Sequence, residues 1–226
     1  MNLKIVFENE RFAIVNKPYD LNFHSEEEAG FVVHATKMLK AEQLFPVHRL
    51  DKMTSGMVIL AKSSEIAKLF GELFESRKIE KFYLAISLRK PKKKQGWIKG
   101  DMAPARRGSY KFVSSNENPA ITQFVSGALR PNERFFLIKP HTGKTHQIRV
   151  ALKSISSPVA GDIRYANTDE AKKEDRGYLH AYGLRFTLGE ELFEFTLDPE
   201  VGERFLSTEC QKALSVWAKP WEHFKK

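Results

Sequence analysis

The sequence predicts an α+β fold in which strands predominate and a few helices are interspersed. Apolar residues recur at alternate positions in several short runs, as they do in half-buried strands, and few segments show the spacing of an amphipathic helix. There is no internal repeat and no linker that clearly separates domains. We therefore expect residues 1–226 to form a single domain, whose core is shared by at most two small lobes.

The first elements are short. The segment LKIVFENERFAIVNKP predicts two strands around a polar turn at 8–11, closed by Pro18. A modest helix is expected after Gly30, and the apolar run at 57–61 is short enough for a buried strand.

The segment SSEIAKLFGELFESRKIEK predicts the clearest helix. A Ser cap and Glu65 open it, one apolar stripe follows its length, and Arg77 and Lys78 are expected in its last turn. The next segment, KFYLAISL, alternates with period two, which places Phe82 and Tyr83 on opposite faces of a strand.

Residues 90–119 are basic, rich in Gly and Pro, and without a long period, so we interpret them as an exposed insertion or a loose hairpin. Two interpretations stay open: a solvated loop, or an arm that contacts a nucleic-acid backbone with Trp97 and Tyr110 among its charges.

The second half predicts further strands and one helix. The strands are TQFVSGAL, RFFLIKP, THQIRVAL, LHAYGLRF and LFEFTL. Strict alternation in THQIRVAL puts Thr145, Gln147, Arg149 and Ala151 on one face of its strand. A short helix at about 203–217 should pack on the carboxy-terminal end.

Charge and composition narrow the class of partner. Lys and Arg number 37 against 28 Asp and Glu, a formal net charge of +9, which favours an acidic partner such as nucleic acid. The single cysteine, Cys210, excludes a disulfide within the chain and a Cys-based zinc site. No signal peptide or apolar run of membrane-spanning length is found, so we expect a cytoplasmic protein without a membrane partner.

The stretch PVHRLDKMTSG sets Asp51 among positive charges before a buried strand. A kinase catalytic loop does not fit, because Leu50 separates the Arg from the Asp and Gly56 stands where Asn is needed. A phosphorylated aspartate would need further acids for Mg²⁺, and its surroundings are basic. HTGKTHQ is not a phosphate loop, since Ile138 replaces the required Gly, and we expect neither metal nor cofactor.

Two interpretations of Asp51 stay open on the residues alone. It is either a turn residue paired with an Arg, or a functional carboxylate beside Arg149 in a cleft formed by two basic turns. An Arg partner favours an ionised carboxylate, which a nucleophile or general base requires.

The motifs, taken together, resemble those of the RluA-type pseudouridine synthases. VHRLDKMTSGMVILAKS is similar to the catalytic motif, and ENERFAIVNKP, KIEKFYLAI, TGKTHQIRVAL with SPVAGDIRY, and LHAYGLRF follow in the family's order over residues 8–186. The resemblance implies a mixed, largely antiparallel sheet flanked by helices around a central catalytic cleft. It further implies isomerisation of specific uridines to pseudouridine in structured RNA (tRNA or 23S rRNA) by base flipping, without a cofactor.

The resemblance also implies roles for individual residues. Asp51 is expected to be the essential carboxylate, Tyr83 to stack on the target base and be a candidate for proton abstraction, and Arg149 to pair with the acid. Arg49 is expected to enter the RNA helix where the flipped base had been. RNA binding and base flipping are assigned to Arg49, His48 and Lys144.

The chain departs from the family pattern at Met53, Lys144 and Ala151, and SISSP replaces a Gly-His-Pro type stretch. Because Lys cannot make the bidentate contact of Arg, a phosphate contact at Lys144 should be weaker. We expect a monomer with no separate amino-terminal RNA-binding domain, similar to members that modify tRNA or one ribosomal hairpin. The alternatives are a catalytically silent RNA-binding or RNA-folding protein on this scaffold, and an enzyme that hydrolyses an N-glycosidic bond.

Overall fold

The computed structural model describes residues 3–26 and 28–224, so the ends of the expected 1–226 domain lie outside the described part. One sheet runs through the molecule in the order β1-β2-β4-β10-β5-β9-β8-β6-β7, with β3 paired to β4 and β11 to β10. Of the strand pairs described, only β4 with β10 is parallel, which confirms a mixed, largely antiparallel sheet. The strands are β1 (Lys4–Glu8), β2 (Phe12–Lys17), β3 (Phe45–Pro46), β4 (Ser55–Ala61), β5 (Glu80–Ser87), β6 (Gln95–Pro104), β7 (Tyr110–Val113), β8 (Ala120–Ala128), β9 (Arg134–Pro140), β10 (Leu179–Leu188) and β11 (Glu191–Thr196).

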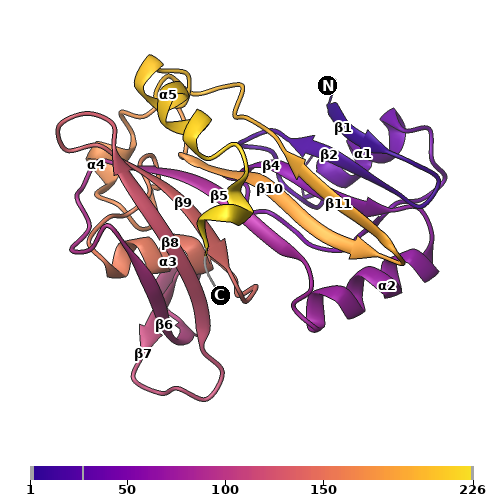
Figure 1. Ribbon diagram of the computed structural model, residues 1–226, viewed down its shortest axis with the longest axis horizontal. Helices are drawn as coiled ribbons and strands as arrows, with labels where there is room; N and C mark the ends of the chain where they lie inside the picture. Colours follow the sequence, from indigo (N-terminus) through magenta and orange to yellow (C-terminus); the bar gives the residue numbers. More distant parts are fainter. Residues whose placement is uncertain (1–2, 27, 225–226) are drawn as a thin grey trace.

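Short helices flank this sheet, as the sequence predicts. In Figure 1, α5 lies at the top of the view and the last turn lies in front of the sheet near β5 and β10, whereas α3 lies behind β8. The helices are α1 (Phe31–Met38), α2 (Ser64–Glu75), α3 (Gln147–Ser154), α4 (Thr168–Ala171), α5 (Thr208–Val216), and the 3-10 turns η1 (Arg106–Gly108) and η2 (Pro220–His223). Arg77 and Lys78 lie beyond the end of α2 and not in its last turn, because the chain takes a left-handed conformation at Arg77, with φ of 57°.

Strand β4 follows the Asp51 turn and is buried along its whole length. Its first residues pair in parallel with the middle of the sheet, Gly56 opposite Ala181 on β10. Only glycine fits here, because φ is +115° and a Cβ would lie 2.3 Å from the carbonyl oxygen of Ala181. This close approach joins the end of the Asp51 turn to the centre of the sheet.

The prediction of a strand at THQIRVAL is wrong, because the segment forms α3, preceded by His146 in a left-handed conformation. Residues 147–152 are all buried, so polar side chains do not mark a solvent face here. Gln147 bonds the carbonyl of Ile121, and Arg149 bonds two carboxylates. The alternation of polar and apolar residues therefore reflects buried polar partners and not a strand.

Of the two structures expected for residues 90–119, an exposed insertion or a loose hairpin, the structure shows a hairpin, but it is ordered and joined to the main sheet. Strand β6 pairs with β8 in the main sheet along its first half and with β7 along its second half. Buried Asp101 accepts hydrogen bonds from the backbone N–H groups of Glu117 and Asn118 (2.8 and 3.0 Å) and so fixes the following loop. The pairing of this hairpin with the main sheet was not predicted, because its Lys, Gly and Pro residues hide a strand with few apolar positions.

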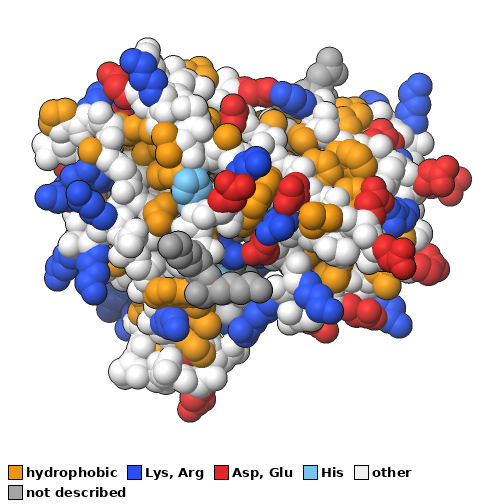
Figure 2. All heavy atoms as spheres, in the orientation of Figure 1, with side chains coloured by type: hydrophobic (Ala, Val, Ile, Leu, Met, Phe, Trp, Pro, Cys, Tyr) orange, Lys and Arg blue, Asp and Glu red, His pale blue; other side chains and the backbone are white. Residues whose placement is uncertain are grey.

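Charge is distributed unevenly over the surface. On the face shown in Figure 2, Lys and Arg side chains are prominent along the left edge, and most Asp and Glu side chains lie over the right half. The left part corresponds to the end of the sheet that contains β6, β8 and β9 (Figure 1). The excess of positive charge is therefore concentrated toward one end of the molecule on this face.

Candidate active site

A cleft of about 750 Å³ is lined by residues from the middle of the sheet and the segments beside it, among them the Asp51 turn, β5, and the segment from β9 into α3. Six Lys and Arg residues line this cleft, against three Asp and Glu residues. Such a cleft suits a polyanion. The basic residues are Arg49, Arg77, Lys81, Lys139, Lys144 and Arg149, and the acids are Asp51, Glu75 and Glu80.

A buried lysine fixes the turn that carries Asp51. The ammonium of Lys17, at the end of β2, donates hydrogen bonds to the carbonyl oxygens of Pro18, Lys52 and Thr54 at 2.8, 3.1 and 2.9 Å. Burial lowers the pKa of Lys17 to about 7, against the opposing effect of the nearby Asp51 carboxylate. Because these bonds connect β2 to both sides of the turn, the position of Asp51 is set by tertiary structure.

A second buried network holds the start of β4. The Oγ of Ser55 accepts a hydrogen bond from Arg176 Nη2 (2.7 Å) and lies 2.7 Å from His180 Nδ1. The hydroxyl therefore donates to His180, whose Nε2–H donates to the carbonyl of Leu197 (2.8 Å). Burial lowers the pKa of His180 to about 3, so this histidine is neutral.

The structure brings Arg149 to Asp51, as expected. Arg149 Nη1 lies 2.9 Å from Asp51 Oδ2, and the two side chains are 7% and 27% exposed. The same guanidinium donates from Nε and Nη2 to the two oxygens of Asp162 (2.7 and 2.9 Å), which is fully buried. Burial alone would lower the pKa of Arg149, but the hydrogen bonds and charges of Asp162 and Asp51 raise it above its usual value.

Asp162 is the site residue that sequence reasoning missed. It lies within the SPVAGDIRY segment, where it was not assigned a role. A buried guanidinium has five N–H donors, and one carboxylate accepts from at most two or three of them, so a second acid was to be expected near Arg149. The signal that identifies it is therefore the burial of Arg149, which the sequence did not reveal.

Tyr83 lies on β5, lines the cleft, and is almost fully buried. Within the described residues its hydroxyl has no hydrogen-bond partner. Burial, and then the charge of Asp51, raises the pKa of this hydroxyl well above its usual value. The side chain is therefore a neutral aromatic ring with an unpaired hydroxyl group, and its position in the cleft fits contact with a base.

The three residues expected to contact RNA are placed differently. Arg49 is exposed at the rim, where Nη2 donates to Thr145 Oγ1 at 3.2 Å, and Lys144 lines the cleft. His48 also lines the cleft, but its Nε2 accepts the backbone N–H of Ile59 at 3.0 Å. Burial, with a smaller effect of Lys81, lowers the pKa of His48 to about 3, so it is neutral and has one nitrogen already engaged.

The departures from the family pattern have different surroundings. Met53 packs against Gly177, where a Cβ would lie 2.3 Å from its methyl group, so the missing side chain leaves the space that Met53 fills. Ala151 is fully buried in α3 among core residues and lies outside the lining of the cleft. These two departures therefore concern packing behind the cleft, whereas Lys144 is in it.

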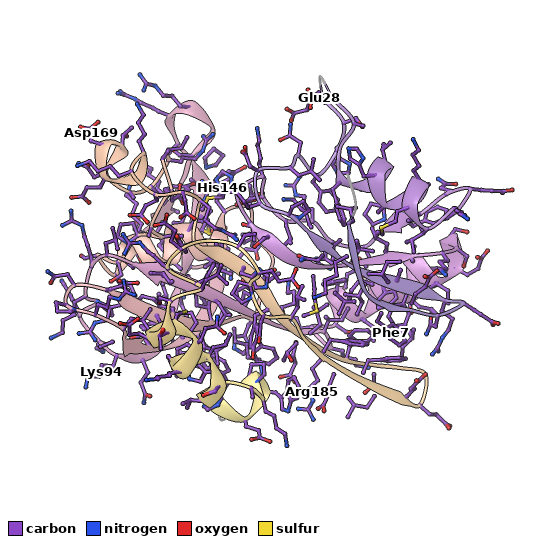
Figure 3. The ribbon with its side chains drawn as sticks, turned by 90° about the horizontal axis from the view of Figure 1, so that it is seen from above. Phe7, Glu28, Lys94, His146, Asp169 and Arg185 are labelled. Carbon is purple, nitrogen blue, oxygen red and sulfur yellow. The ribbon has the colours of Figure 1, made fainter. Side chains whose placement is uncertain are left out.

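Figure 3 shows His146 on the side of the sheet opposite Arg185 and the carboxy-terminal segment.

Within residues 3–26 and 28–224, no group of three or more His, Cys, Asp or Glu could hold a metal ion. The helices of the same residues include none with the length and hydropathy needed to cross a membrane.

Known proteins are similar to this chain in sequence and in fold. Residues 11–154 match the family of RNA pseudouridylate synthases. The "Uncharacterized RNA pseudouridine synthase" of Haemophilus influenzae is 43% identical over 223 residues, which cover 98% of this chain and 99% of the relative. tRNA pseudouridine synthase C of Pasteurella multocida is 29% identical over 83% of this chain and 86% of that one. Human RNA Pseudouridylate Synthase Domain Containing 1 has the same fold, with a TM-score of 0.76 at 23% identity over 96% of this chain and 95% of its own.

The family match covers more than half of the chain, and the Haemophilus relative aligns along nearly its whole length. The chain therefore belongs to the RluA-type RNA pseudouridine synthases and is an isomerase that converts uridine in RNA to pseudouridine.

Proposed function

We propose that this enzyme modifies specific uridines in a structured RNA, either tRNA or a 23S rRNA hairpin, and that Asp51 is its essential carboxylate. The observation that carries the proposal is the hydrogen bonding of the Asp51 carboxylate in the cleft. Its Oδ2 is bonded by Arg149, while its Oδ1 has no hydrogen-bond donor among the described residues. Relatives named tRNA pseudouridine synthase C and ribosomal large subunit pseudouridine synthase D support both RNA classes.

The reaction breaks the bond between N1 of uracil and the sugar, rotates the base, and joins ring carbon 5 to the same sugar carbon. The proton on carbon 5 is then lost and N1 gains one, so no oxidant or further reactant is consumed. We assign Oδ1 of Asp51 to the sugar, where it either attacks the anomeric carbon and leaves again when carbon 5 bonds there, or removes the 2′ proton and later returns it. Arg149 keeps the carboxylate oriented while this occurs.

We assign Tyr83 to the flipped base, on which its ring stacks. Proton abstraction from carbon 5 stays a prediction for the hydroxyl. Burial keeps this group protonated at neutral pH, so it would have to lose its own proton before it could act as the base. Tyr83→Phe separates the two roles, since it keeps the ring and removes only the hydroxyl. Loss of tritium release with retained RNA affinity would assign the proton to Tyr83, and retained release would leave it with stacking alone.

We assign Arg49 to the RNA helix. A base in a stack must be flipped before the sugar can be reached, at a cost of about a few kcal/mol. Arg49 is exposed at the rim of the cleft beside Thr145, so its guanidinium can fill the gap left by the base. Lys144 and the other basic residues of the cleft would bind the backbone phosphates.

The direct test is tritium release from RNA labelled at carbon 5 of uridine, with wild type and Asp51→Asn. Asp20→Asn is a matched control, because Asp20 is a neighbouring exposed acid whose only described ion pair is with Lys52 at 3.6 Å. We expect Asp51→Asn to abolish release and the control to keep it. Equal release from wild type and Asp51→Asn would refute the role of Asp51.

The same assay separates the alternatives. A catalytically silent RNA-binding protein predicts salt-sensitive binding with no pseudouridine formed in any RNA. Hydrolysis of the N-glycosidic bond predicts free uracil among the products. Pseudouridine mapping of total tRNA and rRNA from cells lacking this gene identifies the modified uridine and distinguishes the two RNA classes.

A further inference from the structure

His146 lies next to Asp51 and has no role in the mechanism above. It stands at the N-cap of α3 with φ of 57°, a left-handed conformation that is uncommon for a residue other than glycine. Its side chain lines the cleft and is 15% exposed, and its Nε2 lies 3.9 Å from Asp51 Oδ2. The strained backbone thus places an imidazole nitrogen beside the oxygen that Arg149 also contacts.

Tyr165 determines which nitrogen of His146 holds the proton. The Tyr165 hydroxyl oxygen accepts the backbone N–H of Tyr110 at 2.8 Å and lies 2.9 Å from His146 Nδ1. Among the described residues, Nδ1 is the one acceptor within hydrogen-bond distance of this hydroxyl. Tyr165 therefore donates to Nδ1, and a neutral imidazole then has its proton on Nε2.

We propose that His146 is a positioning residue, whose Nε2–H is directed at Oδ2 of Asp51 because Tyr165 fixes its tautomer. Arg149 and His146 then hold the same carboxylate oxygen from two sides, which leaves Oδ1 to react. At 3.9 Å the contact is longer than a hydrogen bond, and it shortens when substrate fills the cleft, as active-site contacts commonly do. This inference rests on the proposed role of Asp51.

The surroundings keep the imidazole neutral and fixed. Burial lowers the pKa of His146, and Arg149 and Arg164 lower it further, against the opposing charges of Asp51 and Asp162. The rings of Tyr110 and Tyr165 both contact the imidazole edge-on, with centroids 5.6 Å away.

Asp162 connects the two donors to Asp51. Its Oδ1 accepts the backbone N–H of Tyr165 (3.2 Å) as well as Nη2 of Arg149 (2.9 Å). The Arg149 guanidinium also lies over the Tyr165 ring, 5.0 Å from its centroid. One buried carboxylate thus sets the guanidinium and, through Tyr165, the imidazole.

The tautomer can be measured directly in the full chain by ¹⁵N NMR that correlates the ring nitrogens of labelled histidine with ring hydrogens. The chain has seven histidines, and the His146 signals are assigned by their loss in His146→Gln. At pH 7 we expect the Nε2–H form in wild type and a mixture of both forms in Tyr165→Phe. An Nδ1–H form in wild type, or an unchanged tautomer in Tyr165→Phe, would overturn the proposal.

Activity provides the second measurement, with steady-state tritium release. For Tyr165→Phe we expect kcat to fall roughly tenfold, the scale of one lost hydrogen bond, with KM changed less than about twofold. Tyr182→Phe is the matched control, since it removes a buried hydroxyl that donates to Trp217 O (3.1 Å) on the other side of the sheet. It should leave kcat unchanged, and urea unfolding of both variants reports any loss of stability.

A second pair of variants tests the donor role of His146 if Tyr165→Phe does not fold. His146→Gln offers an amide N–H near the position of Nε2, whereas His146→Leu offers none, and both have the same unfavourable backbone conformation. We expect the Gln variant to retain more of kcat, and equal values would refute a donor role. If Asp51→Asn keeps activity, the proposed function fails; if it loses activity while Tyr165→Phe keeps kcat, only the positioning role fails.

Discussion

Asp162→Asn should destabilise this protein out of proportion to the few atoms that it changes. Asp162 Oδ1 accepts hydrogen bonds from Arg149 Nη2, Arg164 N and Tyr165 N at 2.9, 3.0 and 3.2 Å. Among the described residues, its Oδ2 accepts only from Arg149 Nε, at 2.7 Å. Asn therefore keeps most bonds by placing its oxygen at Oδ1, and its NH₂ group then faces the Nε–H of Arg149.

The magnitude follows from this geometry. One charge-assisted hydrogen bond, about 1.5–3 kcal/mol, is replaced by two opposed donors. The site is also fully buried, where breaking one partner of an ion pair costs about 3–5 kcal/mol. Because Asp51 still neutralises Arg149 in part, we expect the free energy of unfolding to fall by about 3 kcal/mol.

Urea unfolding followed by tryptophan fluorescence measures this change, and the midpoint should fall by about 1 M for a chain of this length. Asp169→Asn, at an exposed acid in the first turn of α4, is the control and should stay within about 0.5 kcal/mol of wild type. A fall of less than about 1 kcal/mol for Asp162→Asn with an unchanged m value would refute the account of Asp162 as the main partner of Arg149.

Other changes test the remaining features of the structure. Arg49→Ala should impair turnover on folded RNA more than on a flexible single strand, and an equal loss in tritium release on both would count against the gap-filling role. Gly56→Ala should lower the free energy of unfolding by more than about 3 kcal/mol or prevent folding, because the Cβ meets the backbone of Ala181. Gly71→Ala is its control, because Gly71 lies within α2 with open space around its Cβ. It should raise the free energy of unfolding by up to about 1 kcal/mol in the same urea assay. Burial lowers the pKa of His180 to about 3, so below pH 6 the unfolded chain binds a proton that the folded chain does not. The stability of wild type relative to His180→Asn should therefore fall by up to about 1.4 kcal/mol per unit as the pH decreases from 6 to 4, and a difference independent of pH would contradict the burial argument.

The local elements of the fold could be predicted wherever one sequence pattern has one structural explanation. The strand at β4 is a short apolar run, and α2 combines a Ser cap with an apolar stripe, so both elements were predicted, although α2 ends at Glu75, before the expected Arg77 and Lys78. The strand wrongly predicted at α3 and the pairing of the β6–β7 hairpin with the main sheet, which was not predicted, have a common cause. In both segments buried polar residues such as Arg149 and Asp101 follow their partners in the tertiary structure and not a solvent face.

The sequence alone determined the family, the α+β class and the preference for an acidic partner, because motif order, periodicity and net charge are properties of the chain itself. It also predicted that Arg149 would meet Asp51, which the structure places 2.9 Å apart. Only the tertiary structure revealed the residues that act from behind the cleft: Lys17 under the Asp51 turn, Asp162 behind Arg149, and Tyr165 behind His146. These contacts join segments far apart in the chain or depend on burial, and neither a distance in space nor the desolvation of a charge can be read from spacing along a sequence.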